Sequence, residues 1–197
     1  MKKNESIVKD YYNSLSKEYV LDTAYLDMSQ QYSMFEKYLN AGDKVLEIGF
    51  GSGRDFVYFS KKYSVYGIDI TENFVDALKS KGYSNVFLMS ATDFDLNEIF
   101  DGIWACASLL HVEKDKLKKT FCNILNHLKR DGVFYFSFKK GNFDGIRNGR
   151  YFVDMDDELL NEVIKDLPAE IVEKAVTSDV RATRSDVWLN VVLRKTE

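Results

Sequence analysis

The chain has 197 residues, and its 27 basic and 31 acidic side chains give it a formal net charge of −4. This length suits one domain with a sizeable core, and 45% hydrophobic residues is ordinary for a globular protein. This mildly acidic charge composition gives no sign of the clustered basic face that is typical of nucleic-acid-binding proteins, so we expect no nucleic-acid partner. No stretch reaches the roughly 20 apolar residues of a membrane span and the chain starts polar, so we expect no membrane partner and a cytoplasmic location.

The first forty residues are expected to form two helices, because apolar residues recur there at every third or fourth position. From residue 44 the rhythm changes, and short apolar runs alternate with amphipathic stretches. The predicted strands are 45–48, 64–69, 86–89, 102–106 and 133–138, and the predicted helices lie near 54–62, 72–81 and 114–129. Strands that are apolar throughout and separated by helices indicate a parallel sheet that is covered on both faces.

After residue 150 the order of the elements differs. A helix near 155–166 precedes two strands, 169–176 and 186–194, that have no helix between them and should pair as an antiparallel hairpin. The polar segment 142–150, with three glycines around it, is expected to be a mobile loop. The fold class predicted is therefore α/β: a Rossmann-like, doubly wound sheet of seven strands, mostly parallel with an antiparallel final strand.

A glycine-rich motif, Glu47 to Gly53, follows the first predicted strand and leads into a helix. Glycines permit positive φ and let a ligand approach the backbone closely, and the motif falls at the carboxyl end of a strand, where open α/β sheets bind ligands. Asp69 ends the second strand twenty residues after Gly49, a position suited to accepting hydrogen bonds from ribose hydroxyls. Nicotinamide and adenosylmethionine sites both use such an acid, so Asp69 alone does not discriminate between them. The G-x-G-x-G spacing, with Arg54 where a G-x-G-x-x-G loop needs glycine, disfavours nicotinamide.

Several segments resemble class I S-adenosylmethionine-dependent methyltransferases. Glu47 to Gly53 is similar to motif I of that family, Asp69 to its ribose-binding acid, residues 101–111 to its fourth strand and following loop, and 128–133 to the turn before its fifth strand. The likeness covers roughly 42–140 and is strongest to small stand-alone bacterial enzymes, such as the tellurite-resistance and ubiquinone-pathway methyltransferases. It implies S-adenosylmethionine as cofactor and S-adenosylhomocysteine as product.

The resemblance also divides the single domain 1–197 into a helical lid (1–42), a cofactor-binding core (43–140) and a substrate-side loop, helix and hairpin (141–197). It implies that the glycine loop, Cys106 and Ala107 hold the methionine part of the cofactor, that Asp69 holds the ribose, and that Ser90 and Ala91 border the adenine. Family members often have aspartate where Ser90 stands, and Asp93 is a candidate substitute. The implied cofactor contacts are Glu47, Gly49, Phe50, Gly51, Gly53, Arg54, Asp69, Ile70, Ser90, Ala91, Cys106 and Ala107.

His111 is the candidate catalytic residue, because it follows the fourth strand on the ligand side of the sheet. An imidazole of ordinary pKa takes protons near neutral pH; the alternative is a capping or packing histidine. His127, on the predicted helix 114–129, is expected to be exposed. The expected substrate-binding residues are Tyr11, Tyr12, Tyr19, Lys139 and Arg150. The two cations suit a carboxylate or phosphate, although a solvated loop with scattered charge, and tyrosines packed on the sheet edge, are open alternatives.

The activity expected is S-adenosylmethionine-dependent methyl transfer to a small-molecule acceptor by in-line displacement. We expect no metal, because the histidines are not at ligand spacing and the acidic residues form no cage. A monomer or a homodimer is expected, and with only a lid and a terminal hairpin beyond the core the acceptor should be small. Two alternatives stay open: a regulatory protein that binds adenosylmethionine without turnover, and a nicotinamide-dependent oxidoreductase.

Overall fold

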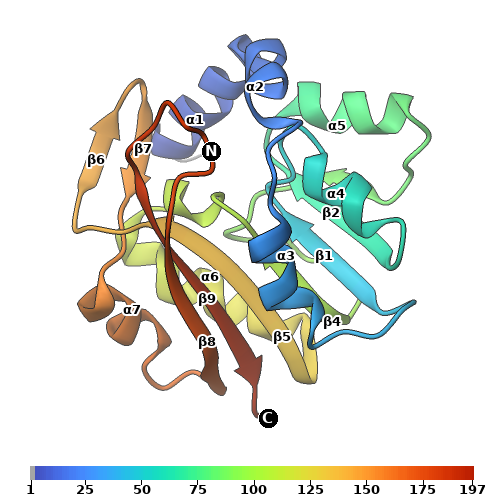
Figure 1. Ribbon diagram of the computed structural model, residues 1–197, viewed down its shortest axis with the longest axis vertical. Coiled ribbons are helices and arrows are strands. Elements are labelled where there is room, and N and C mark those ends of the chain that lie inside the picture. The colour runs from blue at the N-terminus through green and yellow to red at the C-terminus, as the bar shows by residue number, and fades with distance from the viewer. Residues whose placement is uncertain (1–2) are drawn as a thin grey trace.

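The computed structural model describes residues 3–197 and is built around one seven-stranded sheet in the order β3-β2-β1-β4-β5-β9-β8 (Figure 1). The first five strands run parallel, and β9 pairs antiparallel with both β5 and β8. The strands of this sheet are β1 (Lys44–Ile48), β2 (Ser64–Asp69), β3 (Val86–Leu88), β4 (Phe100–Ala105), β5 (Leu128–Lys139), β8 (Ala169–Ser178) and β9 (Val187–Lys195). The α-helices are α1 (Lys3–Ser14), α2 (Ser16–Thr23), α3 (Ser29–Glu36), α4 (Arg54–Phe59), α5 (Glu72–Ser80), α6 (Leu117–Asn126) and α7 (Asp157–Ile164).

Both faces of the sheet are covered by helices, because the central strands alternate apolar side chains between two cores. On β5, Phe134, Phe136 and Phe138 belong to the core that also contains residues of α6 and α7. Val133 and Tyr135, which alternate with them along the strand, belong to the other core with residues of α3, α4 and α5. The near-continuous apolar runs of the sequence therefore arise from strands that are buried on both sides.

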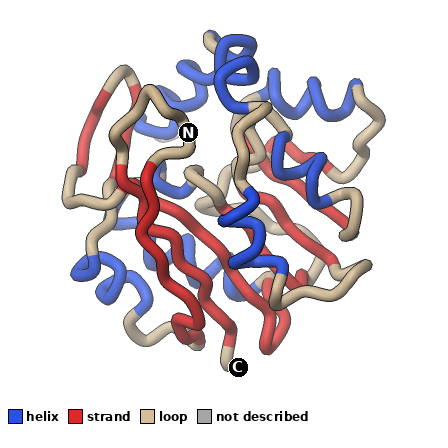
Figure 2. Tube along the Cα trace, viewed as in Figure 1, coloured by secondary structure: helices blue, strands red, loops and turns tan. Residues whose placement is uncertain are grey.

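The carboxyl ends of β1, β2 and β4 meet at one edge of the sheet, and the strand order reverses between β1 and β4. Ligands of open α/β sheets bind at such a switch point. Helices α1 and α2 lie over this edge, at the top of Figures 1 and 2, and α1 packs against β7 (Arg150–Val153). The N-terminal helices therefore cover the place where a ligand is expected.

The predicted fold class is confirmed: a mostly parallel seven-stranded sheet with an antiparallel final strand. The first forty residues form three helices rather than two, because the chain breaks its helical path near Leu15. The helix predicted over 114–129 ends at Asn126, and the turn expected at 130–132 lies inside β5, where Asp131 has a φ of 63° and the pairing with β4 shifts register.

The predicted loop 142–150 is largely a β-hairpin, in which β6 (Asp144–Arg147) pairs antiparallel with β7. Its two-residue turn consists of Asn148 and Gly149, with φ values of 51° and 75°. Asn-Gly with both residues at positive φ is the preferred turn of a tight hairpin, because its twist matches that of the strands. The hairpin carries Arg147 and Arg150 on either side of this turn.

A polar network is buried on the α4 side of the sheet, around Asp55 at the start of α4. Its carboxylate accepts hydrogen bonds from the Tyr32 hydroxyl at 2.6 Å and from the Trp104 indole at 2.9 Å. The Arg54 guanidinium adds a bidentate pair at 2.6 and 2.9 Å, and Asp55 is 3% exposed. Because donors from α3, α4 and β4 all bond to this one buried carboxylate, the network fixes α3 and α4 against β4.

Tyr32→Phe is expected to lower the free energy of unfolding by about 2 kcal/mol, because it removes one hydrogen bond to a buried charge and keeps the ring. The matched control is Tyr58→Phe, whose hydroxyl donates to Glu36 at the surface and should cost less than about 0.5 kcal/mol. Urea unfolding measures both. Equal losses in the two variants would show that Asp55 does not depend on Tyr32.

Candidate functional site

The glycine loop connects β1 to α4 in a left-handed conformation. Gly49, Gly51 and Gly53 have φ values of 74°, 51° and 77°, which side chains with a Cβ rarely adopt. A Cβ on Gly51 would lie 2.9 Å from Tyr19 Cε1, and one on Gly49 would lie 2.5 Å from Ser108 Cβ. The loop therefore requires glycine both for its backbone and for the close approach of its neighbours.

Asp69, at the end of β2, ties this loop to the next strand. Its Oδ2 accepts a hydrogen bond from the Gly51 amide at 2.9 Å and its Oδ1 one from the Thr71 amide at 2.8 Å. Burial raises the pKa of Asp69, and the bonds from the backbone amides oppose that rise. The Thr71 side chain and the Ile70 amide add further hydrogen bonds that lower this pKa, so several donors of the protein hold the carboxylate at the end of β2.

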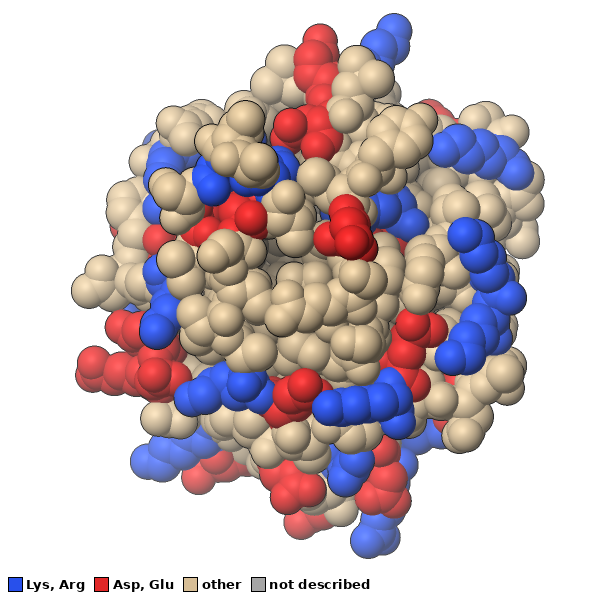
Figure 3. Space-filling view, viewed as in Figure 1, with Lys and Arg blue, Asp and Glu red and all other residues tan. Residues whose placement is uncertain are grey.

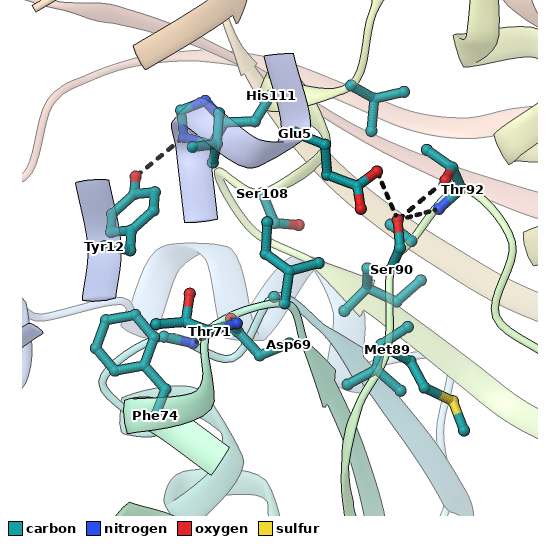
Figure 4. A pocket seen from close by; sticks show the side chains of 18 of the residues that line it. Glu5, Tyr12, Asp69, Thr71, Phe74, Met89, Ser90, Thr92, Ser108 and His111 are labelled. Atoms are coloured by element: carbon teal, nitrogen blue, oxygen red, sulfur yellow. Dashed lines mark hydrogen bonds between the residues drawn. The ribbon is translucent and has the colours of Figure 1, made fainter. Parts of the chain in front are cut away.

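A hollow of about 840 Å³ lies beside the loop, between the strand ends and α1, and we call it the glycine-loop cavity (Figure 4). Seven of the twelve residues expected to contact the cofactor line it: Gly49, Gly51, Asp69, Ile70, Ser90, Ala91 and Ala107. Sequence reasoning missed other lining residues, which come from α1, from the start of α5 and from the ends of β3 and β4. They include Glu5, Val8, Thr71, Phe74, Met89, Thr92 and Ser108.

Five residues predicted for the cofactor do not line this cavity. Phe50 packs on the Phe56 ring, and Gly53 lies against Leu78. Glu47 is 3% exposed beneath the loop, where burial raises the pKa of its carboxyl well above the usual range. Arg54 and Cys106 instead line a third cavity, on the far side of the loop.

Ser90 and Ala91 follow β3 as expected, but the acid beside them comes from another element. Glu5, on α1, accepts a hydrogen bond from the Ser90 hydroxyl at 3.2 Å, and Thr92 lies 3.0 Å from the same oxygen, as Figure 4 shows. Asp93, the candidate substitute for a family aspartate, is exposed and lies outside the cavity wall. The contact between Glu5 and Ser90 joins residues 85 positions apart, so no local sequence pattern predicts it.

A second hollow, which we call the cationic cavity, adjoins the first. It is lined by all five residues expected to bind substrate, Tyr11, Tyr12, Tyr19, Lys139 and Arg150, and by the further cations Arg147, Arg181 and Arg184. Tyr12, Tyr19, Ala107 and His111 line both hollows. These four residues mark the boundary across which one ligand can meet another.

His111 lies in a short 3-10 helix (Leu109–His111) that follows β4. Its Nδ1 is 2.7 Å from the carbonyl oxygen of Tyr151, which only accepts hydrogen bonds, so Nδ1 carries the hydrogen. Burial, and to a smaller degree the charge of Arg150, lower the pKa of His111 to about 3, so the ring is neutral at pH 7. Its Nε2 is consequently an acceptor and receives the Tyr12 hydroxyl at 3.0 Å. The ordinary pKa expected from the sequence is wrong here, because the ring is packed against Tyr12 and Phe152.

Tyr12 connects this imidazole to a guanidinium. Its hydroxyl donates to His111 Nε2 and accepts from Arg150 Nη1 at 2.9 Å. Tyr12 thus lies between a base and a cation, in the wall shared by the two hollows.

The second histidine has a different place. His127 was expected to be exposed, but it is only 8% exposed, because the helix ends before it and turns the ring inward. Its Nδ1 bonds to the Asn123 carbonyl at 2.9 Å and its Nε2 accepts from the Leu96 amide at 3.3 Å. It lines neither the glycine-loop cavity nor the cationic cavity.

Residues 3–197 contain no group of three or more histidine, cysteine or acidic side chains arranged to hold a metal ion. Within the same range no helix is long and apolar enough to cross a membrane.

Comparisons with known proteins agree with this geometry. Residues 45–132 match the model of a protein family described as a methyltransferase domain. A phosphoethanolamine N-methyltransferase of Plasmodium falciparum (isolate 3D7) is 31% identical over 117 residues, which are 54% of this chain and 44% of that protein. The chain thus spans less than half the length of the curated relative it matches.

Solved structures show the same fold at low identity. A 1,6-didemethyltoxoflavin N1-methyltransferase of Burkholderia thailandensis, with S-adenosylhomocysteine bound, is 20% identical with a TM-score of 0.81, over 98% of this chain and 88% of that one. The N-methyltransferase NodS of Bradyrhizobium japonicum WM9, also with S-adenosylhomocysteine, is 15% identical with a TM-score of 0.76, over 99% and 100% of the chains. A [4+2]-cyclase, SpnF, is 14% identical with a TM-score of 0.75, over 98% and 96%. The fold therefore also supports other chemistry, and the residues of the site decide which reaction a protein of this fold catalyses.

Proposed function

We propose that the chain is a class I S-adenosylmethionine-dependent methyltransferase and that it transfers a methyl group from S-adenosylmethionine to a small-molecule acceptor. The observation that carries this proposal is the neutral imidazole of His111, whose Nε2 accepts a hydrogen bond where the two hollows meet. A lone pair at that boundary can take a hydrogen bond from an acceptor in the cationic cavity.

The residues of the glycine-loop cavity fit the adenosine part of this cofactor. The Asp69 carboxylate, which lines the cavity, suits the ribose hydroxyls because its oxygens accept hydrogen bonds, and the apolar side chains of Phe74 and Met89 suit the faces of a flat base. Glu5 and Thr92 offer oxygen acceptors beside Ser90 for an exocyclic amine. The glycine loop and Ala107, where all three hollows meet, leave backbone exposed for the amino-acid part.

S-adenosylmethionine supplies a methyl group bonded to a sulfonium sulfur, which is a good leaving group without metal activation. We therefore assign no metal to the reaction, and we assign direct in-line displacement. The acceptor's lone pair forms the new bond to the methyl carbon while the carbon–sulfur bond breaks. The electron pair of the broken bond stays on sulfur. The Nε2 lone pair of His111 accepts a hydrogen bond from the acceptor and so directs the attacking lone pair toward the methyl carbon, and the proton that the acceptor loses passes to solvent. Tyr12 and Tyr19 keep water from the boundary and align the acceptor.

The relatives favour a nitrogen acceptor. Those named above include a phosphoethanolamine N-methyltransferase and a toxoflavin-precursor N1-methyltransferase. An N–H group can donate to the Nε2 lone pair in place of the Tyr12 hydroxyl. We propose that the acceptor of this chain is likewise a small molecule with a reactive nitrogen.

The proposal is tested by turnover with methyl-labelled S-adenosylmethionine and a panel of small amines that includes phosphoethanolamine. We expect labelled methylamine product and an equal amount of S-adenosylhomocysteine with at least one member. Tight binding of S-adenosylhomocysteine without turnover on any amine, alcohol or thiol of a broad panel would instead support a regulatory protein that binds the cofactor.

A further inference from the structure

The cations of the cationic cavity differ in how they are paired. Arg147 forms a bidentate pair with Asp154 at 3.0 and 2.7 Å, and Lys139 pairs with Asp186 at 2.7 Å. Arg181 and Arg184 at the rim are paired too, with Asp179 or Asp22. Each of these charges is already offset by a carboxylate of the protein.

Arg150 is the exception among these five cations, because it takes part in none of the ion pairs of the described chain. Its Nη1 donates to a neutral oxygen, the Tyr12 hydroxyl, and its Nε is buried with no hydrogen-bond partner. A buried donor left unpaired costs about 1–3 kcal/mol, and more in a charged group. The Arg150 guanidinium is thus held in the protein without a carboxylate to offset its charge.

Aromatic rings hold the Arg150 guanidinium in place. Its Cζ lies 4.4 Å from the centre of the Tyr11 ring, 5.0 Å from that of Phe152 and 5.4 Å from that of Tyr12. Rings on α1 and β7 therefore position a planar cation by stacking, and leave its N–H groups for an oxyanion.

The position of Arg150 relates it to the proposed reaction. The two hydrogen bonds through Tyr12 keep Arg150 Nη1 within at most about 6 Å of His111 Nε2. A small molecule can reach both groups at once, with an anionic end at Arg150 and a nucleophile at the imidazole. The face of the molecule in Figure 3 intersperses acidic with basic side chains and shows no broad basic patch for a polyanion.

We propose that Arg150 is the anion-binding residue of the acceptor site, and that the acceptor carries a carboxylate or phosphate group a few bonds away from the atom that is methylated. This inference rests on the proposed function in one respect: only if the chain transfers a methyl group is the bound anion part of a methyl acceptor. Anion binding by Arg150 itself does not depend on methyl transfer.

The test uses calorimetric titration of the protein saturated with S-adenosylhomocysteine. The probes are phosphoethanolamine and ethanolamine, which differ only by the anionic group, and then inorganic phosphate and acetate. We expect phosphoethanolamine to bind at least about tenfold more tightly than ethanolamine, the size of a charge-assisted hydrogen bond. The preference between phosphate and acetate identifies which anion the site takes.

Two variants locate the effect. Arg150→Gln is expected to abolish the difference between phosphoethanolamine and ethanolamine, whereas Arg150→Lys should retain part of it, because lysine keeps the charge without the planar fork. The matched control is Arg194→Gln, which removes an arginine stacked over the Tyr38 ring at 5.2 Å, outside the cationic cavity, and should leave both affinities within twofold. Affinity for S-adenosylhomocysteine, measured on each variant, reports whether the variant is folded.

Wild-type affinity for phosphoethanolamine in Arg150→Gln would overturn the inference, and so would equal binding of the two amines by the wild type. Failure of S-adenosylhomocysteine to bind the wild type would instead contradict the proposed function. The probes would then be titrated without it, and anion binding that depends on Arg150 would still stand.

Discussion

His111→Asn is expected to lower the rate of methyl transfer by about 10–10²-fold, at or below the lower end of the usual contribution of a general base, because a pKa of about 3 makes Nε2 a weak base at neutral pH. Asparagine can still donate to the Tyr151 carbonyl, as Nδ1 does, but it offers no basic nitrogen at the position of Nε2. Single-turnover rates with an acceptor from the amine panel measure the effect. Affinity for S-adenosylhomocysteine should stay within about threefold, because the imidazole contributes only part of that wall.

The control for this substitution is His127→Asn. His127 is also a buried histidine with one nitrogen on a carbonyl and the other accepting from an amide, but it lies outside both hollows. It should cost about 1–2 kcal/mol of stability and leave turnover unchanged. Loss of turnover in both variants would indicate a structural effect, and an unchanged rate in His111→Asn would exclude a role of His111 in directing the acceptor.

The pH dependence separates these cases further. Burial and the nearby charges of Arg150, Lys139 and Arg147 lower the pKa of His111 to about 3, so the neutral form is present above that pH. Protonation of His111 should therefore reduce kcat/KM only as the pH falls toward 3, and no inflection belonging to His111 is expected near its ordinary pKa of about 6.5. An inflection near 6.5 that His111→Asn removes would contradict the neutral, buried imidazole described above.

Gly51→Val is expected to abolish binding of S-adenosylhomocysteine. A valine Cβ would lie 2.9 Å from the Tyr19 ring and its methyl groups would project into the wall of the glycine-loop cavity, at a backbone φ of 51° that disfavours β-branched residues. The Gly51 amide, which donates to Asp69, would also shift. Calorimetric titration should show at least a 100-fold loss of affinity, or about 2.7 kcal/mol.

Gly82→Val is the matched control, because Gly82 has a φ of 91° with no atom within 4 Å of its missing Cβ. It carries similar backbone strain away from the cavity, so it should lose stability but keep its affinity for S-adenosylhomocysteine. If Gly51→Val binds as tightly as the wild type, the ligand does not lie along this loop.

The sheet could be predicted from the sequence because each of its central strands has a local pattern of apolar residues. The runs that became β1, β2 and β5 are apolar on both faces, and only a sheet covered by helices buries them in that way. Asp69 was predicted to accept hydrogen bonds from ribose hydroxyls because it ends the second strand, and it does lie at the shared edge of the strand ends, where it also bonds to the Gly51 amide.

Other features were missed because a side-chain direction or a contact between distant residues decides them. Arg54 follows the glycine loop in sequence, but the first turn of α4 directs its side chain to Asp55, away from the glycine-loop cavity. Glu5 meets Ser90 only because α1 folds across the strand ends. The hairpin β6–β7 did have a local signal, the Asn148-Gly149 turn, which its charged and glycine-rich surroundings obscured.

The most direct test of the central claim is a parallel thermal-unfolding titration of the purified protein with S-adenosylhomocysteine, S-adenosylmethionine and NAD. A ligand of the native state at ~100 times its dissociation constant stabilises that state by about 2.7 kcal/mol, which such a titration resolves. The site described here predicts stabilisation by the first two ligands and none by NAD. Stabilisation by NAD alone, or by none of the three, would contradict the assignment of the glycine-loop cavity and the reaction derived from it.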